Sequence, residues 1–383
     1  MADISLELCG LRMASPLMLA SGILGETGPS LLKAIKAGAG AVVTKSIGMV
    51  PRDGYPNPTV VETECGLLNA IGLANPGIDE YIKELQAAVK GSGGVPVIGS
   101  IFAGEPGEFA ELAKAMASGG ASAVELNLSC PHAERSPEKM GVLLGQDPEA
   151  CRQVVGEVRR AVQVPLIVKV TPQVANVMAV VRAVEQAGAS AVTMTNRFMG
   201  FAVDIERAAP YTGSWAAVGG PWIAPLTLRW VAQCHRDSRL PILGSNGAAE
   251  WSDVVEFVMA GASLVQLVGR FMLTGPELIP RILTDLTAFM QRKGYGSIRE
   301  MVGVAARAAV PYTELHRIPA QRMRLVSELC SDCGKCLHAC YYGALIRQGE
   351  EVVVTDACVG CELCAVFCPT GALQVEVVGA GPA

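Results

Sequence analysis

Cysteine spacing is the strongest chemical signal in this chain of 383 residues. Eight of its 13 cysteines form two runs near the C-terminus, each with the pattern Cys-x-x-Cys-x-x-Cys-x-x-x-Cys. Thiolates separated by two residues can bind different corners of one cubic iron–sulfur cluster, and the fourth cysteine of such a run binds the neighbouring cluster. The pattern therefore predicts two [4Fe-4S] clusters that transfer single electrons. The expected ligands are Cys330, Cys333, Cys336 and Cys368 for one cluster, and Cys340, Cys358, Cys361 and Cys364 for the other.

Zinc binding and disulfide bonding are two other uses of paired cysteines. Zinc sites take four ligands each and do not need the trailing x-x-x-Cys-Pro that ends at Pro369. A disulfide scaffold is typical of secreted chains, and the first residues lack the basic and then apolar pattern of a secretion signal. Tyr341 stands where the first run would ordinarily carry proline, a departure that leaves all eight thiols in place. Iron–sulfur clusters remain the favoured interpretation.

Composition narrows the class of protein. A chain of 383 residues suffices for one large and one small domain, and 50% hydrophobic residues with 42 glycines suit a large α/β core. A net charge of −5 gives no reason to expect nucleic acid or an acidic membrane surface as a partner. No apolar run is long enough to suggest a membrane span. We expect a cytoplasmic protein, because thiols reserved for metal suit a reducing compartment.

Short apolar runs alternate with longer helical patterns before residue 300. This alternation is typical of parallel β/α units, and eight of them favour a (β/α)₈ TIM barrel, with a doubly wound sheet as the competing fold. The expected domains are a barrel at 1–300, a connector at 301–325 and a small α+β domain like the bacterial ferredoxins at 326–378. The expected barrel strands are Leu17–Gly22, Ala41–Ser46, Pro96–Ile101, Ala123–Ser129, Pro165–Val170, Ala191–Asn196, Pro241–Gly247 and Leu264–Arg270.

Polar residues lie at or just past the end of most predicted strands, as in Asn246-Gly247 at the end of the seventh and Gly269-Arg270 at the end of the eighth. In a barrel this end carries the active site, and the loops after strands seven and eight commonly bind phosphate. A phosphate-bearing cofactor is therefore expected, although the same glycines could serve only as turns. Flavin mononucleotide (FMN) is the most economical choice, because it exchanges two electrons with a substrate and single electrons with clusters. Nicotinamide cannot do both, and no Gly-x-Gly-x-x-Gly follows a strand.

Cys130 is the strongest candidate for a catalytic residue in the predicted barrel. It follows a strand end, and the loop after it, residues 133–145, is rich in charged residues and could act as a lid over the barrel mouth. A cysteine there can deliver a proton to a substrate carbon, or remove one, while hydride passes on the other face. A half-buried structural thiol is the alternative, and the residues alone leave both open.

Several motifs resemble known flavoenzymes. The run Asn127-Leu128-Ser129-Cys130-Pro131-His132, with Lys45-Ser46, residues 66–77, Lys169 and Asn196, is similar to the class 1 dihydroorotate dehydrogenases and to the flavin-and-cluster part of dihydropyrimidine dehydrogenase. The two-cluster tail resembles the second family, including its bacterial two-subunit form. The resemblance implies an FMN-binding barrel, an acid/base role for Cys130 and a pyrimidine-like substrate that reacts at a CH–CH bond. It also implies a homo-oligomer and an electron partner, either a ferredoxin or an NAD-dependent flavoprotein subunit.

The same resemblance assigns site residues one by one. It implies that the amides of Asn69, Asn127 and Asn196 bind the ring. The backbone of Ile71, Gly72 and Leu73 is expected to hold a carboxylate. Lys45 and Lys169 suit the flavin, whose reduced form a nearby cation stabilises. The positions that match FMN contacts are Ala20, Gly22, Lys45, Ser46, Ser100, Asn127, Lys169, Gly220, Asn246, Gly247, Gly269 and Arg270, with Ser100 replacing an asparagine usual in the dihydroorotate enzymes.

Two further substrate-binding candidates, His132 and Arg197, do not both match the same one of the two resembling families. His132 agrees with the dihydropyrimidine enzymes, whereas the region of Asn69 agrees with the dihydroorotate enzymes. Arg197 stands where both families place a small hydroxyl residue, and its guanidinium would either bind a carboxylate or fill the pocket. The substrate therefore stays open between a pyrimidine and another cyclic or aromatic acid or acyl compound. If Arg197 fills the pocket, the chain would instead be a non-catalytic electron-transfer subunit.

Overall fold

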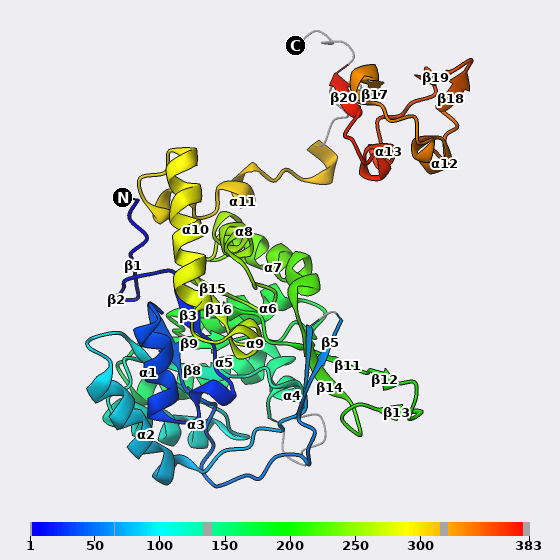
Figure 1. Ribbon diagram of the computed structural model, residues 1–383. Coiled ribbons are helices and arrows are strands. Elements are labelled where there is room, and N and C mark those ends of the chain that lie inside the picture. Colours follow the sequence, from blue (N-terminus) through cyan, green and yellow to red (C-terminus); the bar gives the residue numbers. More distant parts are fainter. Residues whose placement is uncertain (1, 65, 133–139, 315–320, 378–383) are drawn as a thin grey trace. The chain divides into compact units, whose positions relative to one another are not determined.

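Figure 1 shows the computed structural model, which describes residues 2–64, 66–132, 140–314 and 321–377. The chain divides into two compact units, Met1–Ala309 and Val310–Ala383. Most of the loop predicted as a lid, residues 133–139, lies outside the described residues, and its end forms the short helix α4 (Val142–Gly145). None of the helices in the described part of the chain is long and apolar enough to cross a membrane.

The first unit is a closed barrel of eight parallel strands, as the alternating pattern predicted. Its strands follow one another around the barrel in chain order, so a doubly wound sheet is excluded. They are β3 (Leu17–Leu19), β4 (Ala41–Val43), β7 (Val97–Ile101), β8 (Ala123–Asn127), β9 (Leu166–Lys169), β10 (Ala191–Met194), β15 (Ile242–Ser245) and β16 (Leu264–Leu267). Most end two or three residues before the predicted bound, so that polar residues such as Ser46, Asn196 and Asn246 come after the paired strand.

Helices cover the outside of the barrel (Figure 1). Helix α5 shows why these segments are helical: Asp147 caps its first backbone N–H groups, Pro148 occupies the first turn, and its buried face is apolar. The larger helices are α1 (Gly28–Lys36), α2 (Ile78–Gly91), α3 (Pro106–Ser118), α5 (Pro148–Ala161), α6 (Val177–Gln186), α7 (Ala224–Asp237), α8 (Trp251–Ala260) and α10 (Leu278–Lys293). Shorter ones are η1 (Ile23–Gly25), η3 (Pro221–Ile223), α9 (Gly269–Thr274), η4 (Ile298–Met301), α11 (Val304–Ala308) and η5 (Tyr312–Glu314).

The barrel interior changes from apolar to polar along the strands. Because side chains alternate between the two faces of a strand, Ala123 and Glu125 both point inward, two residues apart. At the amino end, inward-facing apolar residues such as Ala123 and Ile167 pack against the hairpin of β1 (Leu6–Leu8) and β2 (Leu11–Met13). One layer nearer the carboxyl end, the inward-facing residues are Glu125, Lys169, Thr193 and Gln266, all buried. This polar layer lies directly below the expected site.

A second, antiparallel sheet stands beside the barrel and was not predicted. It joins β11 (Phe198–Gly200), β14 (Ala216–Gly219), β6 (Gly66–Asn69) and β5 (Val60–Thr63) in that order. A hairpin of β12 (Val203–Asp204) and β13 (Ala209–Pro210) extends from it (Figure 1). The sequence pattern missed these strands because each has only three or four residues. The sheet places the end of β6, with Asn69, across from β14.

The second unit is a small α+β fold. Strand β17 (Gln321–Leu325) pairs with β20 (Leu373–Val377), and β18 (Leu345–Gln348) pairs with β19 (Glu351–Val354). Each cysteine run contains one short helix, α12 (Lys335–Ala339) or α13 (Leu363–Phe367), and η6 (Ser327–Leu329) precedes the first run.

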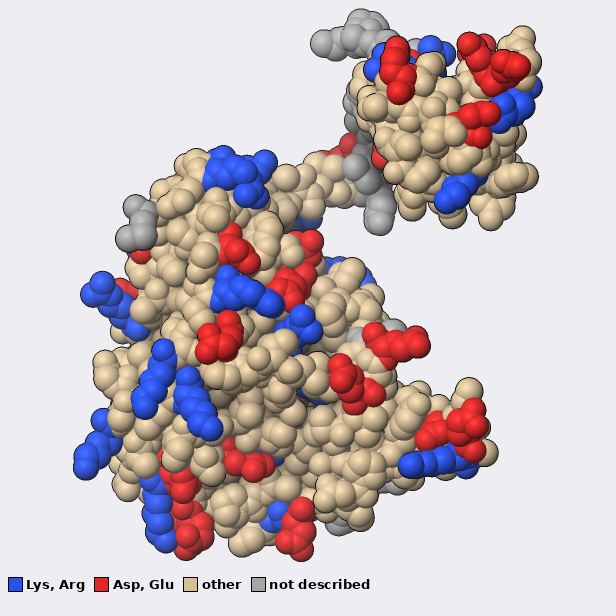
Figure 2. All heavy atoms as spheres, viewed as in Figure 1, with Lys and Arg blue, Asp and Glu red and all other residues tan. Residues whose placement is uncertain are grey.

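The expected connector contributes to both units, because α11 packs on the barrel helices α7 and α8 whereas β17 belongs to the second unit. On the face in Figure 2, acidic and basic side chains are interspersed.

Candidate active site

Two adjoining cavities lie at the carboxyl ends of the barrel strands. The first contains Cys130 and encloses about 820 Å³, part of it open to solvent; we call it the Cys130 cavity. The second, the glycine cavity, encloses about 1510 Å³ and is lined by Gly219, Gly220, Gly247 and Gly269. The walls shared by both cavities are Ser21, Leu67, Lys169, Asn196, Arg197 and Val268. A molecule with two chemically different ends could occupy both.

The structure brings nearly all predicted site residues to these walls. The Cys130 cavity contains every residue expected at the substrate, namely Asn69, Ile71, Gly72, Leu73, Asn127, Cys130, His132, Asn196 and Arg197. Of the residues expected at FMN, it holds Gly22, Lys45, Ser46, Asn127 and Lys169. The glycine cavity holds Ala20, Lys169, Gly220, Asn246, Gly247, Gly269 and Arg270. Ser100 is the exception, because it lines neither cavity.

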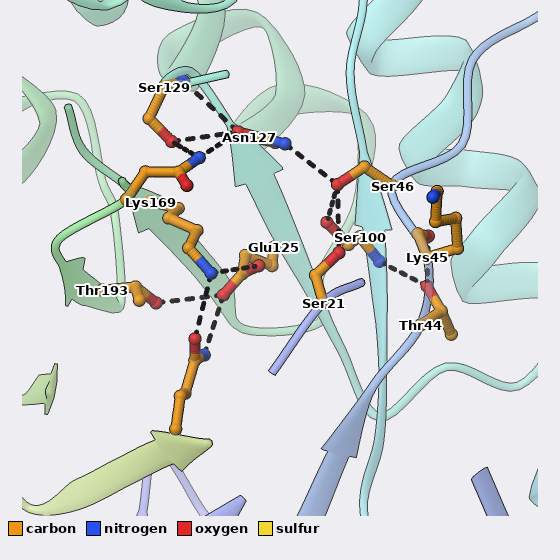
Figure 3. Close-up of polar contacts among 12 residues, drawn as sticks. Ser21, Thr44, Lys45, Ser46, Ser100, Glu125, Asn127, Ser129, Lys169 and Thr193 are labelled. Atoms are coloured by element: carbon orange, nitrogen blue, oxygen red, sulfur yellow. Dashed lines mark hydrogen bonds and ion pairs between the residues drawn. The ribbon is translucent and has the colours of Figure 1, made fainter. Parts of the chain in front are cut away.

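Hydroxyl groups fix the amide of Asn127 (Figure 3). Its Nδ2 donates to Ser46 Oγ at 2.9 Å, and its Oδ1 accepts from Ser129 Oγ at 2.9 Å. Ser46 Oγ also lies 2.9 Å from Ser100 Oγ and 3.1 Å from Ser21 Oγ. Ser100 is fully buried behind Ser46, so it reaches the cavity only through that hydroxyl. The backbone N–H of Ser129 also donates to Asn127 Oδ1 at 3.3 Å, and because an N–H only donates, this bond defines which end of the amide is the acceptor.

Asn196 continues this network from the other side of the cavity. Its Nδ2 donates to Ser129 Oγ at 2.9 Å, and its Oδ1 accepts from the backbone N–H of Arg197 at 2.8 Å. Asn246 Nδ2 donates to the carbonyl oxygen of Asn196 at 3.1 Å. Residues after three different strands, β8, β10 and β15, are therefore held in one arrangement. Such pre-organised amides suit a flat ring with alternating N–H and C=O groups.

Cys130 is enclosed by apolar side chains. Its neighbours in this cluster are Leu73, Phe102 and Met140. Burial raises the pKa of the Cys130 thiol to about 11, although the backbone N–H of His132 and the positive charges of Arg52 and Lys45 act in the opposite direction. The thiol is therefore protonated at neutral pH. Among the described residues it is the only buried thiol on the walls of the Cys130 cavity and the glycine cavity.

His132 is a neutral group that fixes the neighbouring loop. Burial lowers the pKa of its imidazole, and the nearby charge of Arg197 lowers it further, whereas a hydrogen bond to Asn69 acts in the opposite direction. Its Nε2 lies 2.6 Å from the carbonyl oxygen of Asn69 and must carry the proton, because a carbonyl only accepts. Tyr55 Oη donates to the carbonyl oxygen of His132 at 3.1 Å. His132 thus ties the end of β6 to the loop that carries Cys130.

Three cationic side chains line the Cys130 cavity, and they differ in their partners. Lys45 Nζ lies 3.3 Å from Glu26 Oε1, and Lys169 Nζ lies 3.9 Å from Glu125 Oε1. No carboxylate in the described part of the chain forms an ion pair with Arg197. Burial lowers the pKa of its guanidinium to about 10, so that it stays charged at neutral pH. The cavity therefore carries a positive charge that an anionic ligand would balance.

The glycine cavity fits a phosphate-bearing group. Gly247 has φ of +132°, and a Cβ there would lie 2.7 Å from Ala224 Cα, so only glycine is accommodated. Thr195 Oγ1 and Arg270 Nε are buried polar atoms without a hydrogen-bond partner in the described part of the chain. Arg270 also pairs with Glu250 at 2.8 Å, which holds it at the cavity. Orphaned donors beside a glycine-lined wall indicate that a polar ligand completes the site.

Sequence reasoning missed several residues at this site. Glu125, Thr193 and Gln266 of the polar layer contact Lys169 or its partners, and Glu62 and Glu64 line the glycine cavity. The available signal was a charged residue at the centre of a buried strand, in Ala-Val-Glu-Leu-Asn. A buried carboxylate requires a partner, so this pattern alone suggested a cation nearby.

Two smaller cavities in the second unit are each lined by four cysteines. One, of about 320 Å³, is lined by Cys330, Cys333, Cys336 and Cys368. The other, of about 330 Å³, is lined by Cys340, Cys358, Cys361 and Cys364. This is the three-plus-one division that the spacing predicted. Within the described ranges, no three of the side chains Cys, His, Asp and Glu lie close enough together to hold a single metal ion.

Comparison with known proteins identifies the family. A model of the dihydroorotate dehydrogenase family matches residues 3–290, and a model of 4Fe-4S binding domains matches residues 351–374. The chain therefore belongs to the dihydroorotate dehydrogenase family and is an oxidoreductase with an iron–sulfur domain.

Curated relatives match over most of this chain. The catalytic subunit of dihydroorotate dehydrogenase B (NAD(+)) from Thermoplasma acidophilum is 39% identical over 308 residues, which are 80% of this chain and 100% of the relative. The subunit of the same name from Pyrococcus furiosus is 41% identical over 80% of this chain and 99% of the relative. The subunit of the same name from Methanosarcina mazei is 41% identical over 78% of this chain and 94% of the relative. About a fifth of this chain has no counterpart in them.

The raised pKa of Cys130 leads to a pH-dependent reactivity. We expect its alkylation by iodoacetamide to be slow at pH 8 and to rise about tenfold per pH unit, because only the thiolate reacts. The rate should reach half of its maximum near the pKa of about 11. Peptide mass spectrometry measures the rate at this one cysteine. The same thiol in urea-unfolded chain is the control and should reach half of its maximal rate near pH 8.5, the pKa of an unperturbed thiol. A half-maximal rate at that lower pH in the folded protein would contradict the assignment.

Proposed function

We propose that this protein is an FMN- and iron–sulfur-dependent oxidoreductase that interconverts a CH–CH and a C=C bond in a pyrimidine-like ring. Dihydroorotate and orotate are the best supported pair. The observation that carries the proposal is the Cys130 cavity, which a buried thiol lines together with Asn69, Asn127 and Asn196. The curated relatives, which are named for dihydroorotate, support the same choice.

FMN fits the two adjoining cavities. The glycine cavity, with the unpaired donors of Thr195 and Arg270, suits the phosphate, and Lys45, Ser46, Asn127 and Lys169 suit the ring. When bound, FMN supplies hydride exchange with the substrate and single-electron exchange with the clusters. Ser100 would support the ring only through Ser46. We therefore assign the remaining FMN positions to direct contacts and Ser100 to an indirect one.

The chain's own residues would bind the ring and transfer the proton. The amides of Asn69, Asn127 and Asn196 orient the ring, and the backbone of Ile71 to Leu73 lies beside them. Cys130 is protonated at neutral pH, so in the reductive direction the thiol already carries the proton that it donates to a ring carbon. In the oxidative direction it must first lose that proton, which the charges of Lys45 and Arg52 favour. The apolar neighbours of Cys130 exclude competing water.

Replacement of the thiol tests this role. We expect Cys130→Ser to lower turnover with dihydroorotate by at least about 100-fold, because a positioned acid or base contributes that much. The flavin absorbance and the iron content should stay at wild-type values. Stopped-flow measurement of flavin bleaching under anaerobic conditions separates the chemical step from substrate binding. Unchanged bleaching in the variant would overturn the assignment, and absence of bleaching by any dihydro compound in the wild type would favour a non-catalytic electron-transfer subunit.

Arg197 supports a substrate that carries a carboxylate. Its guanidinium has no carboxylate partner in the described part of the chain, stays charged, and lines the same cavity as Cys130. A planar guanidinium binds a carboxylate through two parallel hydrogen bonds. This favours orotate over uracil, which lacks the carboxylate. Another cyclic or aromatic acid is the second candidate, because the same guanidinium would bind it equally well.

Ligand titration distinguishes these substrates. We expect Arg197→Ser to weaken orotate binding by about 10- to 100-fold, since hydrogen bonds to charged groups contribute about 1.5–3 kcal/mol. Uracil is the matched control, and its affinity should not change. Arg197→Lys, which keeps the charge and loses the planar fork, should be intermediate. The change of the flavin spectrum on ligand addition gives each dissociation constant. Equal losses for orotate and uracil would exclude a carboxylate contact.

The second unit supports electron transfer through two clusters. Its two cysteine cavities follow the predicted ligand sets, and backbone N–H groups of Ala372 and Ala344 donate to Cys368 Sγ and Cys340 Sγ, each at 3.3 Å. Such bonds stabilise negative charge on cluster ligands. The relatives are named as NAD(+) enzymes and as one subunit of an assembly. We therefore propose a ferredoxin or an NAD-dependent flavoprotein subunit as electron partner, and a homo-oligomer as in the resembling families.

Iron analysis tests the number of clusters. We expect about eight iron and eight sulfide per chain, because each cluster holds about four of each. Cys368→Ser and Cys340→Ser should each lower the iron content toward half, since each removes a ligand of a different cluster. Cys151→Ser is the matched control, because Cys151 is a buried barrel thiol that should leave iron unchanged. A wild-type content of about four iron, lowered in one variant only, would restrict the chain to one cluster.

A further inference from the structure

The polar layer inside the barrel is one connected group of four side chains (Figure 3). Glu125 Oε2 accepts from Thr193 Oγ1 and from Gln266 Nε2, each at 3.0 Å. Gln266 Oε1 accepts from Lys169 Nζ at 3.1 Å. Glu125 Oε1 has no hydrogen-bond partner in the described part of the chain and lies 3.9 Å from Lys169 Nζ. The carboxylate thus has one oxygen bonded to neutral partners and one directed at the ammonium group.

Because both side chains are buried, the charge of Glu125 strongly affects the protonation of Lys169. The side chain of Glu125 is 0% exposed and that of Lys169 is 6% exposed, so neither charge is stabilised by bulk water. Burial lowers the pKa of Lys169, the negative charge of Glu125 raises it, and the positive charge of Arg197 lowers it. Thr193 and Gln266, the other members of the layer, do not titrate. Glu125 is therefore the group in this layer that favours the protonated lysine.

The same contacts leave Lys169 with donors for a ligand. An ammonium group has three N–H donors, and within the described residues the structure uses one, to Gln266. Lys169 lines both the Cys130 cavity and the glycine cavity, whereas Glu125 lines neither. A bound molecule that spans the two cavities would meet the ammonium group and not the carboxylate.

We propose that Glu125 is a positioning residue that keeps Lys169 protonated and directed at bound FMN, and thereby sets how readily the flavin accepts electrons. The inference rests on the FMN binding proposed above. A cation beside the flavin stabilises its reduced, anionic form, so loss of the lysine charge disfavours reduction. Glu125 exerts this effect through Lys169, without touching the flavin or the substrate.

The expected signature is a changed pH dependence of the flavin reduction potential. In Glu125→Gln, which keeps the shape of the side chain, the pKa of Lys169 falls because the one buried carboxylate that pairs with it among the described residues is removed. At low pH the lysine is still protonated and the potential should be equal to or above that of the wild type. As pH rises toward 9, the lysine loses its proton and the variant should favour oxidised flavin by at least about tenfold relative to the wild type. Dye-equilibration titrations of the full-length holoprotein measure this.

A second substitution separates charge from structure. Gln266 Oε1 already contacts Lys169 Nζ, so adding Gln266→Glu to Glu125→Gln exchanges the two groups and returns a carboxylate to the ammonium. We expect this double variant to recover the wild-type pH dependence. Glu125→Asp, which draws the charge away from Lys169, should shift the potential in the same direction as Glu125→Gln and by less. It provides a readout if Glu125→Gln does not fold.

Each outcome has a defined meaning. A purely structural Glu125 would lower thermal stability in Glu125→Gln with an unchanged pH dependence, and the double variant would be less stable still. That result would overturn the inference while leaving FMN binding intact. Absence of bound flavin from the wild-type protein would instead overturn the proposed function on which the inference rests.

Discussion

A carboxylate and an ammonium group buried together inside the barrel, on Glu125 and Lys169, form the interaction on which the site depends. Isolated charges in such a place cost several kcal/mol each, and pairing with good hydrogen bonds is what makes them tolerable. Here Thr193 and Gln266 complete the pairing. Gln266 stands on β16, which is not adjacent to β9, so its bond to Lys169 crosses the barrel interior. Only a closed barrel makes this contact.

The chemistry proposed for the cavities follows from what lies above this layer. Cys130 sits among apolar side chains that keep its proton on, while amides fixed by Ser46 and Ser129 offer donors and acceptors in set positions. Arg197 adds a charge that the described residues leave unbalanced. An enclosed thiol, ordered amides and an excess of positive charge together suit a flat, anionic substrate.

The second unit obeys a different constraint, because it is too small to bury much apolar surface. Its core consists of Met323, Ala339, Leu345, Val352, Cys364 and Leu373, so one of the expected cluster ligands belongs to the core itself. Clusters bound across the two cysteine runs would add to the packing of α12 against α13, which already joins these runs. Folding and electron transfer would then depend on the same eight thiols.

Much of the fold and of the candidate site could be predicted from the sequence, because short sequence patterns determine them. The eight apolar runs predicted the barrel, because a strand buried on both faces needs continuous apolar residues. The cysteine spacing predicted which four cysteines line each cavity of the second unit. Motifs such as Asn127 to His132 carried most of the site. Tertiary structure alone decided that Ser100 lies behind Ser46, that His132 binds the carbonyl of Asn69, and that Glu125 meets Lys169 and Gln266. These contacts join residues far apart in the chain, and closure of the barrel, which no local pattern encodes, sets their distances.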